Sequence, residues 1–155
     1  MRLVLDTNVW LDWLVFDDAA LAPLKAAVAE GRAEIFIDAA CEAELARVLA
    51  YDLGKHSLND VAQAACLAEC RRIAQFVQKA NAAEYSTLPP CADRADQVFL
   101  EAALAARADF LVTRDEMLLQ LTRRHGLPFQ IVRSVPIGET SDTAPGTPRH
   151  PSPHT

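Results

Sequence analysis

The sequence predicts an α/β fold in which a parallel sheet carries helices on both faces. Short apolar runs at 2–6, 33–38 and 108–113 are typical of buried strands, and the segments between them have apolar residues at helical spacing. Parallel strands need crossover connections, which helices supply, so this alternation favours a parallel sheet. The 155 residues are 51% hydrophobic and 23% charged, which suits one domain with a substantial core.

The first half of the chain contains two of the predicted strands. Asp17 and Asp18 can cap a helix that Gly31 stops, and Gly54 stops the next helix along the chain. The expected elements are a strand at 2–6, a helix at 8–15, a helix between Asp18 and Gly31, a strand at 33–38 and a helix at 39–53.

The second half continues the alternation. Pro89 and Pro90 close a weaker strand candidate, and Gly126 stops the last helix. The expected elements are a helix at 57–79, a strand at 85–88, a helix at 96–107, a strand at 108–113, a helix at 115–125 and a strand at 129–134. The end of the chain carries four of the nine prolines and almost nothing apolar, so we expect a domain at 1–136 and a disordered tail at 137–155.

The charge balance weighs against a simple nucleic-acid-binding module. The net charge is −6 at pH 7, whereas such modules usually carry a basic surface. No apolar run reaches the roughly 18 residues of a membrane span, and the first apolar run meets Asp6 too soon for a signal peptide. We therefore expect a cytoplasmic protein without membrane contact. The four cysteines form no CxxC pair, so we expect buried thiols rather than a zinc site.

Carboxylates follow the predicted strands at the points where the strands end. Asp6 ends the first strand, and Asp115 follows the fourth. Asp93 and Asp96 follow the third, weaker candidate, and Glu44 lies at the rim of the buried face of the helix after the second. Because parallel strands all end at one edge, where open α/β sheets hold their ligands, we expect these acids to converge there.

Each acid also has a simpler explanation as a helix cap. Asp6 can cap the helix after it, and Asp96 suits the positive end of a helix dipole. Thr113 with Glu116 fits a capping box. Together, however, carboxylates about 5 Å apart would repel each other by about 3 kcal/mol per pair at an effective dielectric constant of about 20. A hard divalent cation is the simplest partner for such a cluster.

Four motifs resemble the PIN domain in their order, spacing and chemistry. They are DTNVW at 6–10, EAELARVL at 42–49, CADRADQVFLEAAL at 91–104 and ADFLVTRDEMLL at 108–119. The resemblance covers residues 2–134 and is greatest to the bacterial toxin components of toxin–antitoxin systems, the VapC-like ribonucleases. It implies a three-layer α/β/α sandwich with a central parallel sheet, and metal-dependent ribonuclease activity at the carboxyl edge of that sheet.

The resemblance also implies a metal site. Its four acids, which would be both catalytic and metal-binding, are Asp6, Glu44, Asp96 and Asp115. Glu44 would bind Mg²⁺ or Mn²⁺ directly or through water, and the other three directly. A metal-activated water would attack an RNA phosphodiester and leave a 5′-phosphate and a 3′-hydroxyl. The implied partners are the RNA substrate, a cognate antitoxin protein and a second copy of the chain.

Four further residues of the motifs receive expected roles. Asn8 and Thr113 match polar residues that support the acids, and Asp93 matches an additional acidic position of the subgroup. Arg114 stands where the subgroup usually has Gly. Its side chain could contact an RNA phosphate or pair with Asp115, and the sequence leaves both open.

Two other enzyme classes fit less well. A phosphoaspartyl phosphatase of the haloacid-dehalogenase type needs a second Asp where this chain has Asn8, and a receiver domain needs a late lysine, whereas no lysine follows Lys79.

A non-catalytic PIN-fold module that binds RNA or protein stays open, and the acidic net charge favours it. An antitoxin could also silence an active nuclease by covering the acid edge. Four apolar residues after the first strand either form a partner surface or pack in the core: Trp10, Trp13, Leu14 and Phe16.

Overall fold

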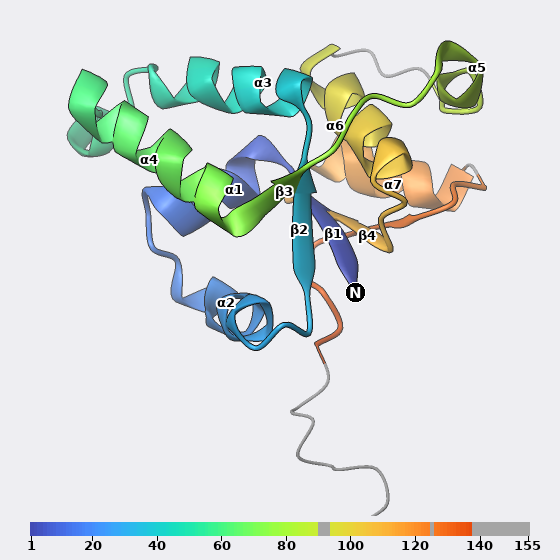
Figure 1. Ribbon diagram of the computed structural model, residues 1–155, viewed down its shortest axis with the longest axis horizontal. Coiled ribbons are helices and arrows are strands. Elements are labelled where there is room, and N and C mark those ends of the chain that lie inside the picture. The colour runs from blue at the N-terminus through green and yellow to red at the C-terminus, as the bar shows by residue number, and fades with distance from the viewer. Residues whose placement is uncertain (90–93, 125, 138–155) are drawn as a thin grey trace, which may run out of the picture.

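A five-stranded parallel sheet forms the centre of the molecule. The computed structural model describes residues 1–89, 94–124 and 126–137 (Figure 1). The strands are β1 (Arg2–Leu5), β2 (Glu34–Ile37), β3 (Ala74–Phe76), β4 (Phe110–Val112) and β5 (Gln130–Val132), in the spatial order β3-β2-β1-β4-β5. Every described pairing between neighbouring strands is parallel. All carboxyl ends of the strands therefore lie at one edge.

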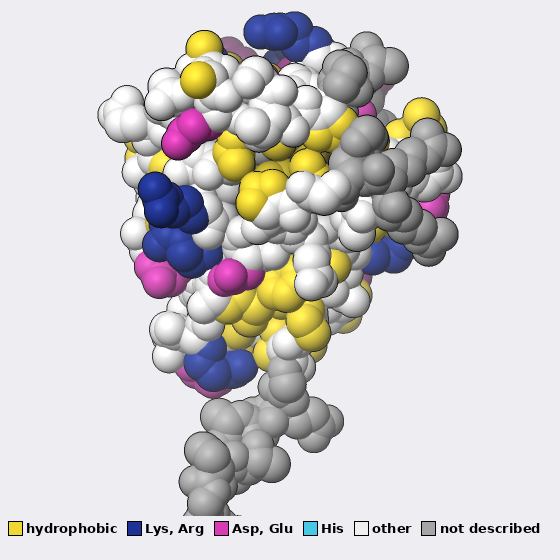
Figure 2. Space-filling view, turned by 90° about the vertical axis from the view of Figure 1, so that its right-hand side faces the viewer, with side chains coloured by type: hydrophobic (Ala, Val, Ile, Leu, Met, Phe, Trp, Pro, Cys, Tyr) yellow, Lys and Arg dark blue, Asp and Glu magenta, His cyan; other side chains and the backbone are white. Residues whose placement is uncertain are grey.

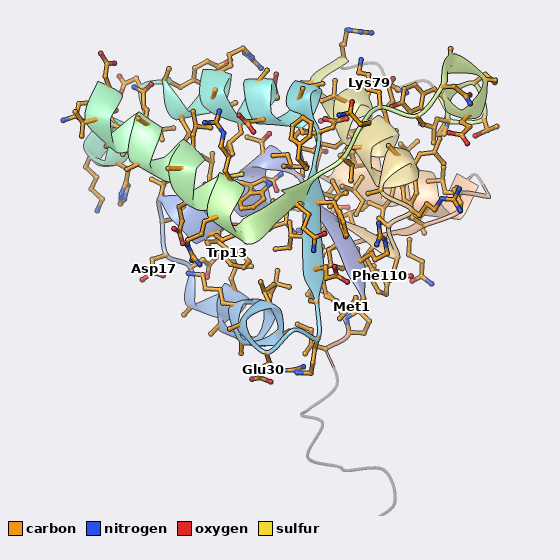
Figure 3. The ribbon with its side chains drawn as sticks, viewed as in Figure 1. Met1, Trp13, Asp17, Glu30, Lys79 and Phe110 are labelled. Carbon is orange, nitrogen blue, oxygen red and sulfur yellow. The ribbon has the colours of Figure 1, made fainter. Side chains whose placement is uncertain are left out.

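Helices cover both faces of the sheet, so the predicted three-layer α/β/α architecture is confirmed. The helices are α1 (Thr7–Leu14), α2 (Ala22–Ala29), α3 (Ala39–Leu49), α4 (Asp60–Ile73), α5 (Ala82–Tyr85), α6 (Arg94–Ala105) and α7 (Glu116–Arg124), with short 3₁₀ turns at Ala19–Leu21 and Gly54–His56. Figure 1 shows α1 to α4 on one side of the sheet and α5 to α7 on the other. Met1 and Glu30 mark the amino edge of the sheet, and Lys79 lies toward the carboxyl edge (Figure 3).

The core consists of the two central strands and the helices packed on them. Leu3, Val4 and Leu5 are at most 1% exposed, because β1 is covered on both faces. Burial of each such side chain contributes about 1.5–3 kcal/mol, so the central strands hold their carboxyl ends firmly in place. Trp10 is also buried, which confirms that it packs in the core, whereas Phe16 is 39% exposed.

The prediction for residues 57–88 is wrong in two places. The helix expected at 57–79 ends at Ile73, and the strand β3 follows it at once, with Phe76 paired to Ile37 of β2. The strand expected at 85–88 is absent, because Asn81 caps the short helix α5 and a turn follows it. β3 is an edge strand with Phe76 56% exposed, so its apolar residues lack the pattern of a buried strand.

The described cysteines are mostly buried. Cys41 and Cys70 are fully buried, as predicted, and Cys66 is partly buried.

No helix in the described part of the chain is long and apolar enough to cross a membrane. Cys91 and the predicted tail beyond Ile137 lie outside the described residues, and the domain boundary expected there stays a prediction.

Candidate metal centre

Asp6 lies at the centre of the carboxyl edge, where β1 ends and α1 begins. Its backbone N–H donates to the Val112 carbonyl over 2.9 Å, which extends the pairing of β1 with β4 by one residue. Its Oδ1 accepts the Thr7 N–H at 2.7 Å and so caps α1. The residue is 5% exposed, which is rare for an acidic side chain. Asp6 can therefore cap α1 and also belong to the candidate site.

Thr113 and Asn8 hold the other oxygen of Asp6. The buried Thr113 hydroxyl donates to Asp6 Oδ2 over 2.6 Å, and the Asn8 side-chain amide donates to the same atom over 3.3 Å. Thr113 also accepts the Asp115 N–H at 3.0 Å, and Asn8 Oδ1 accepts the Arg114 N–H at 3.3 Å. These bonds connect the start of α1 to the β4–α7 junction and fix the orientation of the Asp6 side chain.

Burial, hydrogen bonds and two neighbouring charges act on Asp6. Burial raises the pKa of Asp6 above its ordinary value of 3.8, and the bonds from Thr113 and Thr7 oppose this change. The carboxylates of Asp115 and Glu44 raise the pKa of Asp6 further. The acids predicted from β1, α3 and the β4–α7 junction thus come close enough to interact. Among the described residues, however, no three His, Cys, Asp or Glu side chains form a ready-made cluster for a metal ion.

Glu44 is turned toward a cation of its own helix. Arg47 Nε donates to Glu44 Oε2 over 3.1 Å, and Arg47 Nη2 donates to Glu44 Oε1. The Glu44 side chain is only 16% exposed, whereas that of Arg47 is 53% exposed. This neutralising partner was not expected, although the i,i+3 spacing of the two residues was visible in the sequence.

Asp115 lies two residues beyond Thr113 and caps α7. Its Oδ1 accepts the Met117 N–H at 2.8 Å. The alternative explanation of a capping box between Thr113 and Glu116 is therefore wrong, because the Thr113 hydroxyl bonds to Asp6 and Asp115 provides the cap.

Asp96 lies in the first turn of α6 and is partly buried. Phe99 and Leu100, three and four residues later, are 1% and 0% exposed, so Asp96 is on the core-facing side of its helix, as predicted. The Cys41 thiol donates to the Val98 carbonyl over 3.4 Å, which places the first turns of α3 and α6 against each other. Asp93 lies outside the described residues, and its expected role stays a prediction.

Arg114 pairs with a residue that the sequence did not suggest. Its Nε lies 2.9 Å from Asp12 Oδ2, and its Nη2 donates to Asp12 Oδ1 over 3.2 Å. The expected alternative of a pair with Asp115 is therefore wrong. Burial raises the pKa of Asp12, Arg114 opposes that change, and the charge of Asp18 adds to it.

Asp38 is an acid of this edge that the sequence interpretation missed. The pairing of β1 with β2 places Asp38, directly after β2, level with Asp6. Asp38 is 1% exposed, and its Oδ1 caps α3 by accepting the Cys41 N–H at 2.8 Å. Its Oδ2 has no hydrogen-bond partner among the described residues. The rule that singled out Asp6, a carboxylate at the end of an apolar run, would have found Asp38 as well.

The fold and the acid edge define a class of α/β proteins with a polar centre at the carboxyl ends of β1 and β4. The PIN domain family model matches residues 2–117, and the chain belongs to that family. No curated protein matches the sequence significantly. A solved structure with the same fold is that of VapBC2 from Rickettsia felis, described as bound to a DNA fragment from their promoter. Its TM-score is 0.63 at 16% identity, over 84% of this chain and 97% of that chain.

Proposed function

We propose that this PIN-domain protein is a metal-dependent endoribonuclease that cleaves RNA phosphodiesters, and that it is the toxin of a toxin–antitoxin pair. The observation that carries the proposal is the environment of Asp6. This carboxylate is 5% exposed, neutral donors hold both of its oxygens, and two further carboxylates raise its pKa. A buried anion in such surroundings is best stabilised by a cation from outside the chain.

The donor set fits Mg²⁺ or Mn²⁺. Asp6, Asp96 and Asp115 would hold the ion, with Glu44 binding directly or through water. All of these donors are carboxylate oxygens, which hard divalent cations prefer, whereas the nearby Cys41 thiol is buried and its pKa is raised well above the ordinary value of 9.0. When bound, the ion would neutralise charge on the phosphodiester and make a bound water more acidic.

The chain itself supplies the orientation that such chemistry needs. Thr113 and Asn8 fix the Asp6 carboxylate from one side, and the Thr7 N–H fixes it from the other. Thr113 also fixes the backbone of Asp115. Two of the proposed ligands are thus joined through one buried hydroxyl group, which holds them in place before substrate binds.

Membership of the PIN family and the likeness of fold to the VapBC2 complex support the second half of the proposal. The partner would be an antitoxin protein that covers the acid edge, and a second copy of the chain would complete a dimer.

The test is cleavage of a labelled single-stranded RNA by purified full-length protein with Mn²⁺, Mg²⁺ or EDTA. Asp96→Asn is compared with Asp60→Asn, a matched control because Asp60 also lies in the first turn of a helix but is exposed on α4. We expect metal-dependent cleavage by the wild type and Asp60→Asn, and a loss of at least about 100-fold in Asp96→Asn. Equal cleavage by all three preparations, prepared identically, would show that Asp96 has no part in it.

A non-catalytic module that binds RNA or protein is the second candidate. The pairing of Glu44 with Arg47 and the net charge of −6 favour it. RNA binding without cleavage in either metal would support this candidate over the nuclease.

A further inference from the structure

We propose that Asp38 is a positioning residue of the metal centre, whose Oδ2 atom accepts hydrogen bonds from the hydration water of the divalent cation. The hydroxyl group of Thr7, at the end of the neighbouring strand, supports the same water. The inference rests on the proposed ribonuclease function, because it adds two residues to the metal centre of that function.

The part of the chain that the structure describes leaves two buried side-chain oxygens without a hydrogen-bond partner, Asp38 Oδ2 and Thr7 Oγ1. Both lie at the carboxyl edge of the sheet, because Thr7 comes two residues after β1 and Asp38 directly after β2. The parallel register pairs Val4 with Phe36, so Asp38 is level with Asp6, on strands about 4.8 Å apart. The unsatisfied oxygens therefore lie where the predicted acids converge.

The role of Asp38 as a helix cap does not explain its second oxygen. Asp38 is 1% exposed, and its Oδ1 accepts the Cys41 N–H at 2.8 Å, which caps α3. A cap needs one acceptor, and Ser or Asn would provide it without a second carboxylate oxygen in the interior. A buried acceptor without a donor loses its bonds to water and gains none in return. Asp38 Oδ2 therefore needs a donor from outside the chain.

The described side chains supply no cation to Asp38. None of the ion pairs recorded among them includes this residue. The arginines that pair with acids of α3 bind other residues, Arg47 with Glu44 and Arg71 with Glu42. On the face that carries α5 to α7, basic side chains lie at the surface beside acidic ones (Figure 2). The compensating positive charge is therefore expected to come from a bound cation.

The Cys41 thiol lies close to both carboxylates but does not satisfy Asp38. Its Sγ donates to the Val98 carbonyl over 3.4 Å. Burial is the main cause that raises the pKa of Cys41 well above 9.0, and the charges of Asp38 and Asp6 raise it further. Asp38 thus belongs to the surroundings of the acid edge rather than to a separate part of the core.

A hydrated Mg²⁺ or Mn²⁺ ion has the donors that these two oxygens lack. Mg²⁺ keeps several water molecules when carboxylates bind it, and each water has hydrogens to donate. A carboxylate oxygen is a strong acceptor for them, whereas the Thr7 hydroxyl is a neutral one. A buried water without any cation would satisfy the same atoms, so the experiment must separate the two cases.

The experiment measures Mn²⁺ binding to the metal-free, full-length protein without RNA, from the electron paramagnetic resonance signal of free Mn²⁺. The variants are Asp38→Asn and Asp38→Ser, which both keep a capping oxygen, and Thr7→Val. Asp18→Asn is the matched control, because Asp18 caps the turn Ala19–Leu21 in the same way but is exposed. The Tm of each protein is measured in EDTA and at one fixed Mn²⁺ concentration, and RNA cleavage is measured separately.

We expect both Asp38 variants to bind Mn²⁺ at least about tenfold more weakly than the wild type, as is typical when a residue that supports a metal site is replaced. Thr7→Val should lose about two- to tenfold, because a neutral hydroxyl contributes less than a carboxylate. Asp18→Asn should bind as the wild type does. The Asp38 variants should keep a cooperative unfolding transition in EDTA, and Mn²⁺ should raise their Tm less than that of the wild type.

The failures of the two proposals can be told apart. If both Asp38 variants fold and bind Mn²⁺ within about twofold of the wild type, the inference is wrong, and Asp38 is only a cap or a ligand of a buried water. If the wild type binds no Mn²⁺, the metal centre of the proposed function is wrong and the inference falls with it. If the wild type binds Mn²⁺ but cleaves no RNA, the ribonuclease is wrong, and the measured affinities still decide the role of Asp38.

Discussion

Asp6 and Asp12 are two nearly buried carboxylates at opposite ends of α1 with very different surroundings. They are 5% and 7% exposed, and burial is the main cause that raises the pKa of each. Asp12 receives two bonds from the Arg114 guanidinium. Asp6 receives its recorded bonds from neutral groups, the Thr7 amide, the Asn8 side chain and the Thr113 hydroxyl.

The difference between the two surroundings shows that a buried carboxylate can have a structural role or a functional one. At Asp12 the chain supplies the compensating cation, so the pair fastens the β4–α7 junction to α1. At Asp6 the neighbouring charges recorded for the site are negative, from Asp115 and Glu44. A fold that needed Asp6 only as a cap would be more stable with a neutral residue there. This pattern is typical of sites that have been shaped for a ligand rather than for stability.

The largest loss of stability is expected when the ion pair between Arg114 and Asp12 is broken. Arg114→Gln should lower the free energy of unfolding by about 1–2 kcal/mol, because it leaves the Asp12 carboxylate buried without its cation. The loss stays below that of a fully buried pair, since Arg114 is half exposed. Urea denaturation in EDTA at pH 7 measures it. The double variant with Asp12→Asn should recover most of the loss, and a double variant as unstable as the sum of its parts would contradict the comparison.

Substitution of Asp6, in contrast, is expected to raise the free energy of unfolding. Asn is as good a helix cap as Asp, so Asp6→Asn keeps the bond to the Thr7 N–H and removes the buried charge. Its amide NH₂ cannot accept the bonds that Thr113 and Asn8 donate to Oδ2, which offsets part of the gain. In EDTA at pH 7 the relief of the buried charge should outweigh this loss and raise the free energy of unfolding by an amount on the order of 1 kcal/mol. The metal-free wild type should be the less stable of the two.

The pH dependence of that difference follows from the sign of the pKa change. The folded state binds the Asp6 proton more tightly than the unfolded state, because the folded pKa is raised above 3.8. The wild type therefore loses stability as pH rises from the unfolded pKa through the folded one, and Asp6→Asn does not share this loss. The gap in Tm between the two proteins should be wide at pH 7 and close near pH 4. A gap independent of pH would mean that charge burial at Asp6 is not its cause.

The fold was largely predictable because its central strands are buried on both faces. β1, β2, β4 and β5 are short apolar runs, and all four lie where the sequence places them. β3 was mistaken for part of a helix, because an edge strand of three residues buries too little to show a strand pattern. Only its pairing with β2, which depends on residues about 40 positions earlier, makes Ala74–Phe76 a strand.

The parts of the candidate site that depend on residues close together in the sequence were predictable. The ends of β1 and β4 pointed to Asp6 and Asp115, and in the structure the Thr113 hydroxyl bonds to both residues. The ion pair between Arg114 and Asp12 joins residues that are 102 positions apart, so no local sequence pattern could predict it. Whether Asp96 and Asp93 join the cluster stays a prediction.

The smallest effect is expected at the outer ion pair of α4, between Glu69 and Arg72. The two residues are spaced i,i+3 on the helix surface, and their side chains are 42% and 71% exposed. Such pairs stabilise a fold by about 0.5 kcal/mol or less, so Arg72→Gln should leave the urea midpoint in EDTA almost unchanged. A loss as large as that of Arg114→Gln would mean that an exposed pair stabilises this fold as much as the pair with the buried Asp12, which would contradict the comparison.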